Sequence, residues 1–173
     1  MAGKTMIYRY HTPDGFDDLL LRSDGEFLTG LWFESSFKSG PNQVETSREA
    51  SLHPVIIDTI SWLDVYFSGR QPEFEPSYRI PNLTPFRKEV SEIMCEIPFG
   101  QTMTYGEIAN KIAQTHDIPK MSAQAVGGAV GWNPICIIVP CHRVMGANGK
   151  LTGYGGGIQN KIALLRHEGH DVI

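Results

Sequence analysis

The segment from Pro140 to Arg143 places a thiol beside two basic side chains. Cys141 directly follows the apolar run Ile135–Val139, and His142 and Arg143 come one and two positions later. Neighbouring positive charge lowers the pKa of a thiol from ~8.5 towards neutrality and so populates the nucleophilic thiolate. A reactive Cys141 and a buried cysteine that packs as a small hydrophobic residue both fit this pattern. Adjacent residues of a strand face opposite sides, so His142 can assist Cys141 only where the chain bends, and then through a bridging water.

The other two cysteines have the pattern of structural residues. Cys136 alternates with isoleucines in a predicted strand, and Cys95 lies among Glu92, Met94 and Glu96 on a predicted helix. Because the chain has no CxxC or HxxxH pair, we expect no metal site. The glycine-rich segment 146–157 carries no GxGxxG or GKS/T signature, and no cofactor is predicted. An odd number of cysteines without scaffold-like spacing favours a reducing compartment.

The segment Ser122–Trp132 is predicted to be a helix, although it is rich in glycine. Gly127, Gly128 and Gly131 lie in its interior, and each costs ~1 kcal/mol relative to alanine in a helix. Small residues allow a helix backbone to approach another surface closely. That surface can be another helix or a nucleic-acid backbone, and the sequence leaves both open.

The elements that must position these residues follow from local patterns. Phe86, Val90, Ile93 and Ile97 form the apolar stripe of a helix capped by Thr84. A capping box of Thr104 and Glu107 begins a second helix, which is expected to bury Tyr105.

A polar turn and the helix over 122–132 come next, and the pair of helices indicates a helix-turn-helix. Ile135–Val139 is predicted to be a short buried strand. Ile158, Ile162 and Leu165 line a last helix, which stops at Gly169.

The first half is predicted to contain strands followed by a helix. Residues 6–12 are strand-like, and residues 18–35 carry Asp24-Gly25 between two β-prone runs, which indicates a hairpin. Apolar residues at spacings of four, three and four predict an amphipathic helix over 56–67.

A proline-rich linker separates the two halves. Four of the eleven prolines lie within residues 72–85, so we expect an N-terminal domain over 1–83 and a C-terminal domain over 84–173. The first domain has 7 Lys and Arg against 12 Asp and Glu, and the second has 8 against 7. Any contact with phosphate is therefore expected in the second domain.

The composition is that of an ordinary soluble globular protein, with 173 residues, 41% hydrophobic and 20% charged. No run approaches the ~18 apolar residues of a membrane span, and the N-terminus lacks the apolar core of a signal peptide. We therefore expect a cytoplasmic protein without a membrane partner. The net charge of −4 and the pI of about 5.8 speak against a typical nucleic-acid binder, since such proteins are often above a pI of ~9.

An ordered set of motifs nevertheless identifies a family of DNA-binding proteins. Seven motifs occur in this order: Ile-Pro-Phe-Gly (97–100), Thr-Tyr-Gly-Glu-Ile-Ala (104–109), Ala-Val-Gly-Gly-Ala (125–129), Asn133-Pro134, Pro-Cys-His-Arg-Val (140–144), Gly-Tyr-Gly-Gly-Gly (153–157) and His-Glu-Gly (167–169). With these motifs the chain closely resembles, over residues 84–170, the O6-alkylguanine-DNA alkyltransferases, also called methylated-DNA–protein-cysteine methyltransferases. The resemblance implies an α+β protein, with an N-terminal α/β domain of ribonuclease H-like type and a mostly helical C-terminal domain that contains the helix-turn-helix.

The family's chemistry can be carried over residue by residue. Its members bind double-stranded DNA through the minor groove and rotate O6-alkylguanine out of the stack, and O4-alkylthymine stays open as a second substrate. Cys141 would accept the alkyl group irreversibly in a single turnover, by a protein that acts as a monomer. His142 would deprotonate Cys141 through a water, and Glu168 would orient His142. Tyr105 would help to turn the nucleotide and donate a proton to the guanine, and Asn133 would brace the turn before the active site.

The resemblance also implies a set of residues that bind substrate and DNA. Backbone groups near Cys141 and Val144 would recognise the guanine edge, and the small residues of helix 122–132 would admit the DNA backbone. The binding residues implied in this way are Ala123, Gln124, Ala125, Gly127, Arg143, Val144, Tyr154 and Gly155.

The chain departs from the family pattern at several positions. Gln124 stands where the family usually has an arginine that fills the vacated base position. Ser91 replaces a common tryptophan, and Trp132 occupies a position that is usually small or basic. The N-terminal domain has no cysteine, so the structural zinc site of some relatives cannot form from the same ligands.

Two other functions compete with alkyl transfer. A non-enzymatic, alkyltransferase-like protein would bind the lesion without removing it, but such relatives replace the reactive cysteine, which is intact here. A cysteine hydrolase is disfavoured by the adjacent positions of Cys141 and His142 and by the lack of an oxyanion signature.

Overall fold

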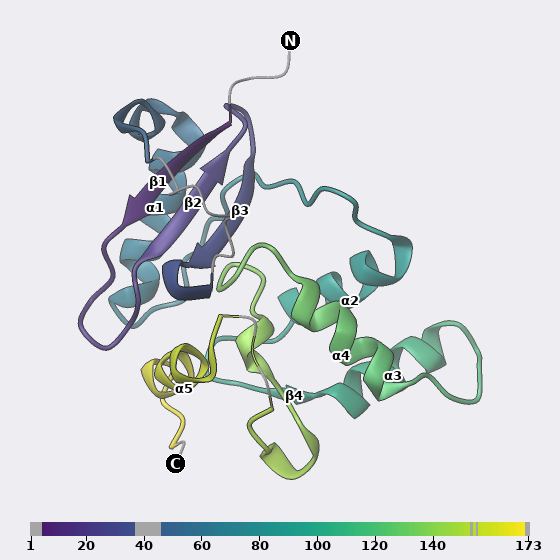
Figure 1. Ribbon diagram of the computed structural model, residues 1–173. Helices are drawn as coiled ribbons and strands as arrows, with labels where there is room; N and C mark the ends of the chain where they lie inside the picture. Colours follow the sequence, from purple (N-terminus) through teal and green to yellow (C-terminus); the bar gives the residue numbers. More distant parts are fainter. Residues whose placement is uncertain (1–4, 37–45, 153, 155, 172–173) are drawn as a thin grey trace. The chain divides into compact units, whose positions relative to one another are not determined.

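The computed structural model describes residues 5–36, 46–152, 154 and 156–171. The chain divides into two compact units, Met1–Pro81 and Asn82–Ile173 (Figure 1). The boundary between the two units therefore lies inside the proline-rich segment, two residues before the expected position. Among the described residues, no helix is both long and apolar enough to cross a membrane.

The N-terminal unit is an antiparallel sheet with one long helix. Strands β1 (Met6–Tyr10), β2 (Leu19–Ser23) and β3 (Leu28–Phe33) lie in the order β1-β2-β3, and the helix α1 (Pro54–Phe67) contacts β2 and β3. The described residues of this unit also form two short 3-10 helices, η1 (Glu34–Ser36) and η2 (Arg48–Leu52). The predicted strands, hairpin and helix are all present, and the sheet and helix share a core of buried leucines and aromatic residues.

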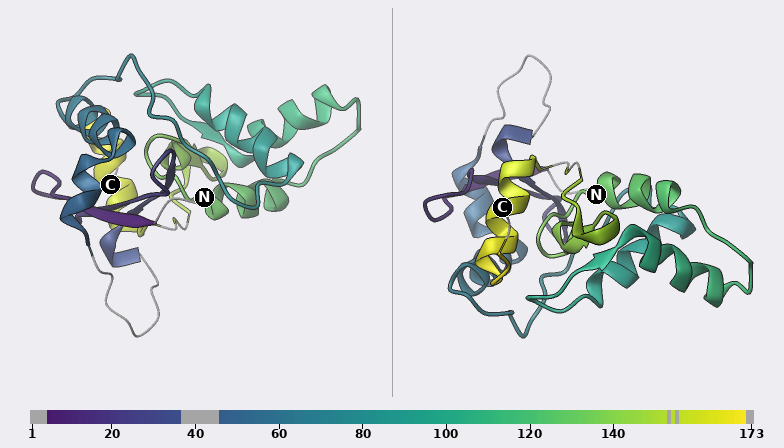
Figure 2. Two further views of the ribbon diagram at one scale, coloured as in Figure 1. Left: turned by 90° about the horizontal axis from the view of Figure 1, so that it is seen from above. Right: turned by 90° about the horizontal axis from the view of Figure 1, so that it is seen from below.

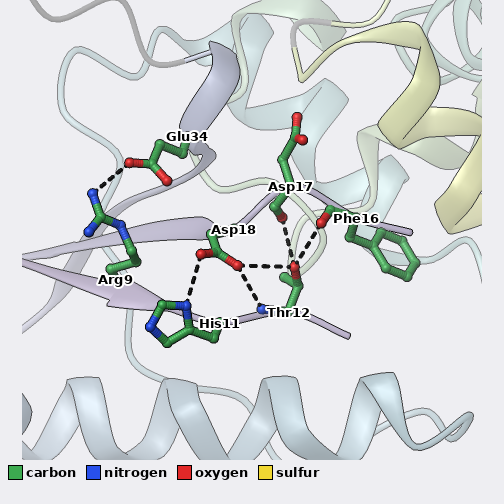
Figure 3. Close-up of polar contacts among 7 residues, drawn as sticks. All are labelled: Arg9, His11, Thr12, Phe16, Asp17, Asp18 and Glu34. Carbon is green, nitrogen blue, oxygen red and sulfur yellow. Dashed lines mark hydrogen bonds and ion pairs between the residues drawn. The ribbon is translucent and has the colours of Figure 1, made fainter. Parts of the chain in front are cut away.

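Polar side chains fix the connection between β1 and β2 (Figure 3). Asp18 accepts hydrogen bonds from the backbone N–H of Thr12 at 3.1 Å and lies 2.9 Å from His11 Nδ1. The Thr12 hydroxyl lies within hydrogen-bonding distance of two carbonyls of the same loop, those of Phe16 and Asp17. Arg9 pairs with Glu34 at 2.6 Å across the sheet. These contacts pair one N–H group and two carbonyls of the loop backbone with side chains of the same loop.

The C-terminal unit is mostly helical. Its elements are α2 (Pro85–Cys95), β4 (Met103–Thr104), α3 (Tyr105–Thr115), α4 (Ala123–Trp132), η3 (Cys141–Arg143), β5 (Val144–Met145), η4 (Ala147–Gly149) and α5 (Ile158–His167). The helices α2, α3 and α4 contact one another, and their teal and green ribbons lie together in both views of Figure 2. Consecutive packed helices α3 and α4 provide the predicted helix-turn-helix, and β4 pairs in parallel with β5.

The predicted helix starts are confirmed by their capping bonds. Thr84 accepts from the N–H of Arg87 at 3.2 Å, and Ser122 accepts from that of Ala125 at 3.2 Å. Thr104 and Glu107 form the complete capping box, with bonds of 3.1 and 3.2 Å. Each cap satisfies N–H groups that have no partner inside the helix, so local sequence is sufficient to set these boundaries.

The predicted strand at Ile135–Val139 is wrong. The segment is buried but turns back on itself, with Ile137 at φ +70° and a bond from the N–H of Val139 to the carbonyl of Ile135 at 3.1 Å. The Asn133 side chain binds Ile135 through both its amide atoms and donates to the Val139 carbonyl at 3.0 Å. Backbone groups that a sheet would have paired are thus satisfied by one side chain, and the chain enters η3 instead of leaving a strand.

Candidate active site

Cys141 and His142 occupy consecutive positions of the short helix η3, and both are buried. In a 3-10 helix adjacent side chains are about 120° apart, so they are not forced onto opposite sides as in a strand. The bend that His142 requires in order to assist Cys141 is therefore present. It results from the turn at Ile135–Val139, which sequence reasoning did not foresee.

Glu168 lies at the centre of a buried ion-pair network. Its carboxylate accepts from His142 Nε2 at 2.5 Å and from Arg143 Nε at 2.7 Å. The backbone N–H of Gly100 adds a further bond at 3.1 Å. Burial by itself would raise the pKa of Glu168, but the hydrogen bonds from His142 and Arg143 and the charge of Arg143 outweigh it and hold that pKa well below its usual value. Glu168 is therefore ionised and can only accept hydrogen bonds.

His142 is neutral and has one ring nitrogen to spare. Burial lowers its pKa, and this effect outweighs the opposing influence of Glu168. Because Glu168 accepts at Nε2, the proton of the neutral ring is on that nitrogen and the lone pair is on Nδ1. Nδ1 is buried and finds no hydrogen-bond partner anywhere in the described part of the chain. The ring thus presents an unused proton acceptor inside the protein.

The side chain of Arg143 is buried and bonded within the protein, whereas the resemblance implied that it binds substrate or DNA. Its guanidinium is buried, where it binds Glu168 and donates to the carbonyl of Ile97 at 2.7 Å. A buried arginine whose donors are taken up in this way holds the carboxylate in place. We therefore reassign Arg143 from substrate binding to the positioning of Glu168.

The thiol of Cys141 is activated by neighbours other than those expected from the sequence. Its pKa is lowered to about 7, first by a hydrogen bond with the thiol of Cys136, against the opposing effect of burial. The side chains of Asn133 and Tyr154 and the charge of Lys161 lower it further. These neighbours therefore favour the thiolate, the nucleophilic form, over the protonated thiol.

Cys136 and Tyr154 stay protonated next to this thiol and act as hydrogen-bond donors to it. The Cys136 thiol has a pKa well above its usual value, because its hydrogen bond with Cys141 and its burial both favour the protonated form. Burial likewise raises the pKa of the Tyr154 hydroxyl, whose oxygen is shielded from solvent. The structural role predicted for Cys136 is therefore incomplete, since it also contacts the reactive group.

Lys161 is a buried cation that sequence reasoning missed. Its ammonium donates to the carbonyl of Val144 at 2.7 Å, and burial lowers its pKa while the nearby Cys141 opposes that change. A signal was available, because Lys161 falls on the apolar stripe formed by Ile158, Ile162 and Leu165. A charged residue at a buried position of a helix is a candidate functional group.

Tyr105 lies at the start of α3 and is half-buried, whereas the prediction had it buried. Its hydroxyl accepts from Thr152 at 3.0 Å, and its ring lies where a side chain on Gly127 would touch it, at 3.8 Å. A side chain here would make an ordinary van der Waals contact with Tyr105, so packing between α3 and α4 does not require a glycine at this position. Gly155, the last of the predicted binding residues, lies outside the described residues.

The exposed face of α4 is open and uncharged. Ala123, Gln124, Ala125, Gly128 and Gly131 are all exposed. A side chain added at Gly128 or Gly131 would meet no atom within 4 Å. Of the two explanations left open by the sequence, contact with another helix does not account for these two glycines.

Comparisons with known proteins agree with this geometry. Residues 85–170 match the family described as "6-O-methylguanine DNA methyltransferase, DNA binding domain". The methylated-DNA–protein-cysteine methyltransferase of Mycobacterium tuberculosis H37Rv is 40% identical over 164 residues, covering 94% of this chain and 93% of the relative. That of Mycobacterium leprae is 44% identical over 170 residues, covering 97% and 96%.

Solved structures give the same result for the fold. The crystal structure of M. tuberculosis O6-methylguanine methyltransferase aligns with a TM-score of 0.72 and 37% identity, over 95% of this chain and 93% of that one. The M. tuberculosis protein OGT in complex with DNA aligns with a TM-score of 0.71 and 36% identity, over 95% and 91%. The α+β fold is thereby confirmed, and the chain belongs to the methylated-DNA–protein-cysteine methyltransferase family.

Proposed function

We propose that this protein repairs double-stranded DNA by moving the alkyl group of O6-alkylguanine onto the sulfur of Cys141. The observation that supports this most is the buried Cys141 thiol of lowered pKa, which directly precedes His142 of the His142–Glu168 pair in the chain. Sulfur attacks the alkyl carbon, a carbon–sulfur bond forms and the bond between that carbon and O6 breaks. The thioether has no route back to a thiol, so each molecule reacts once.

The proton that the Cys141 thiol loses would be accepted by His142. A water between the thiol and Nδ1 of His142 would pass it to the ring, and ionised Glu168 would stabilise the imidazolium that forms. The departing guanine regains a proton, for which we assign the hydroxyl of Tyr105 as donor. Asn133 contributes by holding the turn that places Cys141 at the start of η3.

The partner is DNA, bound on the exposed face of α4. Gly128 and Gly131 leave room for a sugar–phosphate backbone to approach closely, and Gln124 is exposed at the opposite end of the same face, where it can fill the stack that the flipped base vacates. Tyr154 and the backbone at Val144 would form the walls around the guanine. The protein would act as a monomer wherever the DNA is, in the cytoplasm and nucleoid.

A label-transfer experiment tests the proposal. Duplex DNA with a radiolabelled methyl group at O6 of one guanine should leave its label on the wild-type protein, whereas Cys141→Ser should bind the same duplex with little label, because a hydroxyl is a much weaker nucleophile. Tight binding by wild type without label would instead identify a lesion-binding protein. Equal labelling of both proteins would show that Cys141 is not the acceptor.

A further inference from the structure

Arg87 is stacked on Trp132. The guanidinium carbon of Arg87, on α2, lies 4.0 Å from the centroid of the Trp132 ring, at the end of α4. Both side chains are half-buried. Within the described ranges, Arg87 has no carboxylate at ion-pair distance, in contrast to Lys88, Lys111 and Arg143.

The helix α4 itself has no charged residue, although its exposed face is the surface that we assign to DNA. Gln124, Gly128 and Trp132 recur every four residues, so the stacked pair borders that face at its C-terminal end. Phosphate contacts normally supply most of the affinity of a protein for DNA. A DNA-binding helix without a cation needs one from a neighbouring element.

We infer that Arg87, held in place by Trp132, binds a phosphate of the DNA backbone beside α4 and supplies the positive charge that this helix lacks. The inference rests on the proposed function, because it requires α4 to face DNA. It gives a role to Trp132, which is otherwise an unexplained departure from the family pattern.

The stacking geometry suits this role. A ring that covers one face of the guanidinium leaves the N–H groups at its edge free to donate. The planar group is also restrained before DNA arrives, so less side-chain entropy remains to be lost on binding. With no carboxylate to displace, the full charge is available to a phosphate oxygen.

The alternative is that the pair only ties α2 to α4. In that case removal of the charge would alter the stability of the C-terminal unit but not the number of counterions that DNA binding releases. The salt dependence of affinity separates the two, because log affinity falls against log salt with a slope of about 0.9 per neutralised phosphate.

The test measures affinity for an unmodified duplex by fluorescence anisotropy over a range of salt concentrations. Arg87→Met keeps the apolar contact with Trp132 and removes the charge. We expect its slope to be smaller by about 0.9 and its affinity at 0.15 M salt to be about fivefold weaker, as the loss of one phosphate contact requires. Lys88→Met is the matched control on the same helix, where the lysine lies 3.8 Å from Glu92, and its slope should change less.

Two further variants test the part played by Trp132. Trp132→Leu keeps every charge, yet it should weaken DNA binding several-fold. In the double mutant, the further change Arg87→Met should then lower the DNA affinity only slightly. Arg87→Lys should retain the wild-type slope but not the full affinity, because an ammonium does not stack as a planar group.

An unchanged slope in Arg87→Met, or the same slope change in Lys88→Met, would overturn the inference. Its failure is distinguishable from failure of the proposed function, because wild-type protein can be assayed separately with O6-alkylguanine as a free base. Transfer to Cys141 from the free base, together with an unchanged Arg87→Met slope, would reject the role of Arg87 alone.

Discussion

At the scale of single residues, the proton of His142 is the feature on which the chemistry depends. Glu168 is ionised, so Nε2 of His142 must donate to it at 2.5 Å and Nδ1 must carry the lone pair. A general base matters most where the thiol is still protonated, which for Cys141 means below its pKa of about 7. His142→Ala should therefore slow transfer most below pH 7, and the deficit should shrink at high pH, where hydroxide ionises the thiol directly. A single-turnover rate measured across pH checks this, and a wild-type rate at pH 6 would contradict the relay.

Cys136 provides a second prediction at this scale. Its thiol is the first cause of the low pKa of Cys141, so Cys136→Ala should raise that pKa above about 7 and shift the rate profile to higher pH. Cys136→Ser retains a donor and should keep the wild-type profile. The comparison is made with the free O6-alkylguanine base, which removes DNA binding from the measurement. Coincident profiles for the alanine variant and wild type would show that the donor is not used.

Glu168 also affects stability. Its folded-state pKa lies below the unfolded value of ~4.3, so its contribution to stability is present above that pH and is lost as the pH falls towards the folded-state value. Glu168→Gln would leave the charge of Arg143 buried without its partner, which costs ~3 kcal/mol. Denaturant unfolding at pH 7 should show this loss, and the difference from wild type should narrow in acid. A variant as stable as wild type at pH 7 would mean that the network is not stabilising.

At the scale of elements, the interior glycines of the helix α4 lower its stability and leave one of its faces open to solvent. Gly128 is exposed, helical and free of neighbours within 4 Å, so Gly128→Ala should stabilise the protein by about 1 kcal/mol. Gly128→Leu should leave the fold intact but weaken binding to duplex DNA, because its side chain would occupy the approach path. Thermal unfolding and anisotropy, measured on both variants, check the two effects. Unaltered DNA affinity in Gly128→Leu would place the DNA elsewhere.

The elements differ in how far they could be predicted. Caps at Thr84, Thr104 and Ser122 depend on bonds within a few residues, so the sequence alone was sufficient for the helix starts. The turn at Ile135–Val139 was missed, because an apolar run can be a buried strand or a buried turn. The choice depends here on the side chain of Asn133, whose hydrogen bonds replace those of a sheet.

The candidate site likewise contains residues that could be predicted from the sequence and residues that could not. The resemblance brought together Cys141, His142 and Glu168, and the structure places His142 against Glu168. Cys136 and Lys161 were missed as neighbours of Cys141, since their closeness arises only from the folded turn and from the packing of α5. Arg143 was assigned to substrate binding because its position in the chain does not reveal that its side chain points inward.

At the scale of the whole molecule, a net charge of −4 has to be reconciled with binding to DNA. Gln124 lacks the charge that the family usually has at this position. Gln124→Arg should tighten binding to duplex DNA and steepen its salt dependence by about one counterion, because it adds one cation to the exposed face of α4. Its rate on the free base should barely change. If the salt slope stays that of wild type, Gln124 does not face the phosphates.

Peptide mapping by mass spectrometry, after reaction with a duplex containing one O6-methylguanine, tests most directly whether Cys141 is the acceptor. We expect one methyl group per protein molecule, on the peptide that contains Cys141, and the same site in Cys136→Ala. The lowered pKa of Cys141 and the raised pKa of its neighbour Cys136 both favour Cys141 as the thiol that reacts. A methyl group on Cys136 or Cys95, or an unmodified protein bound to the duplex, would contradict it.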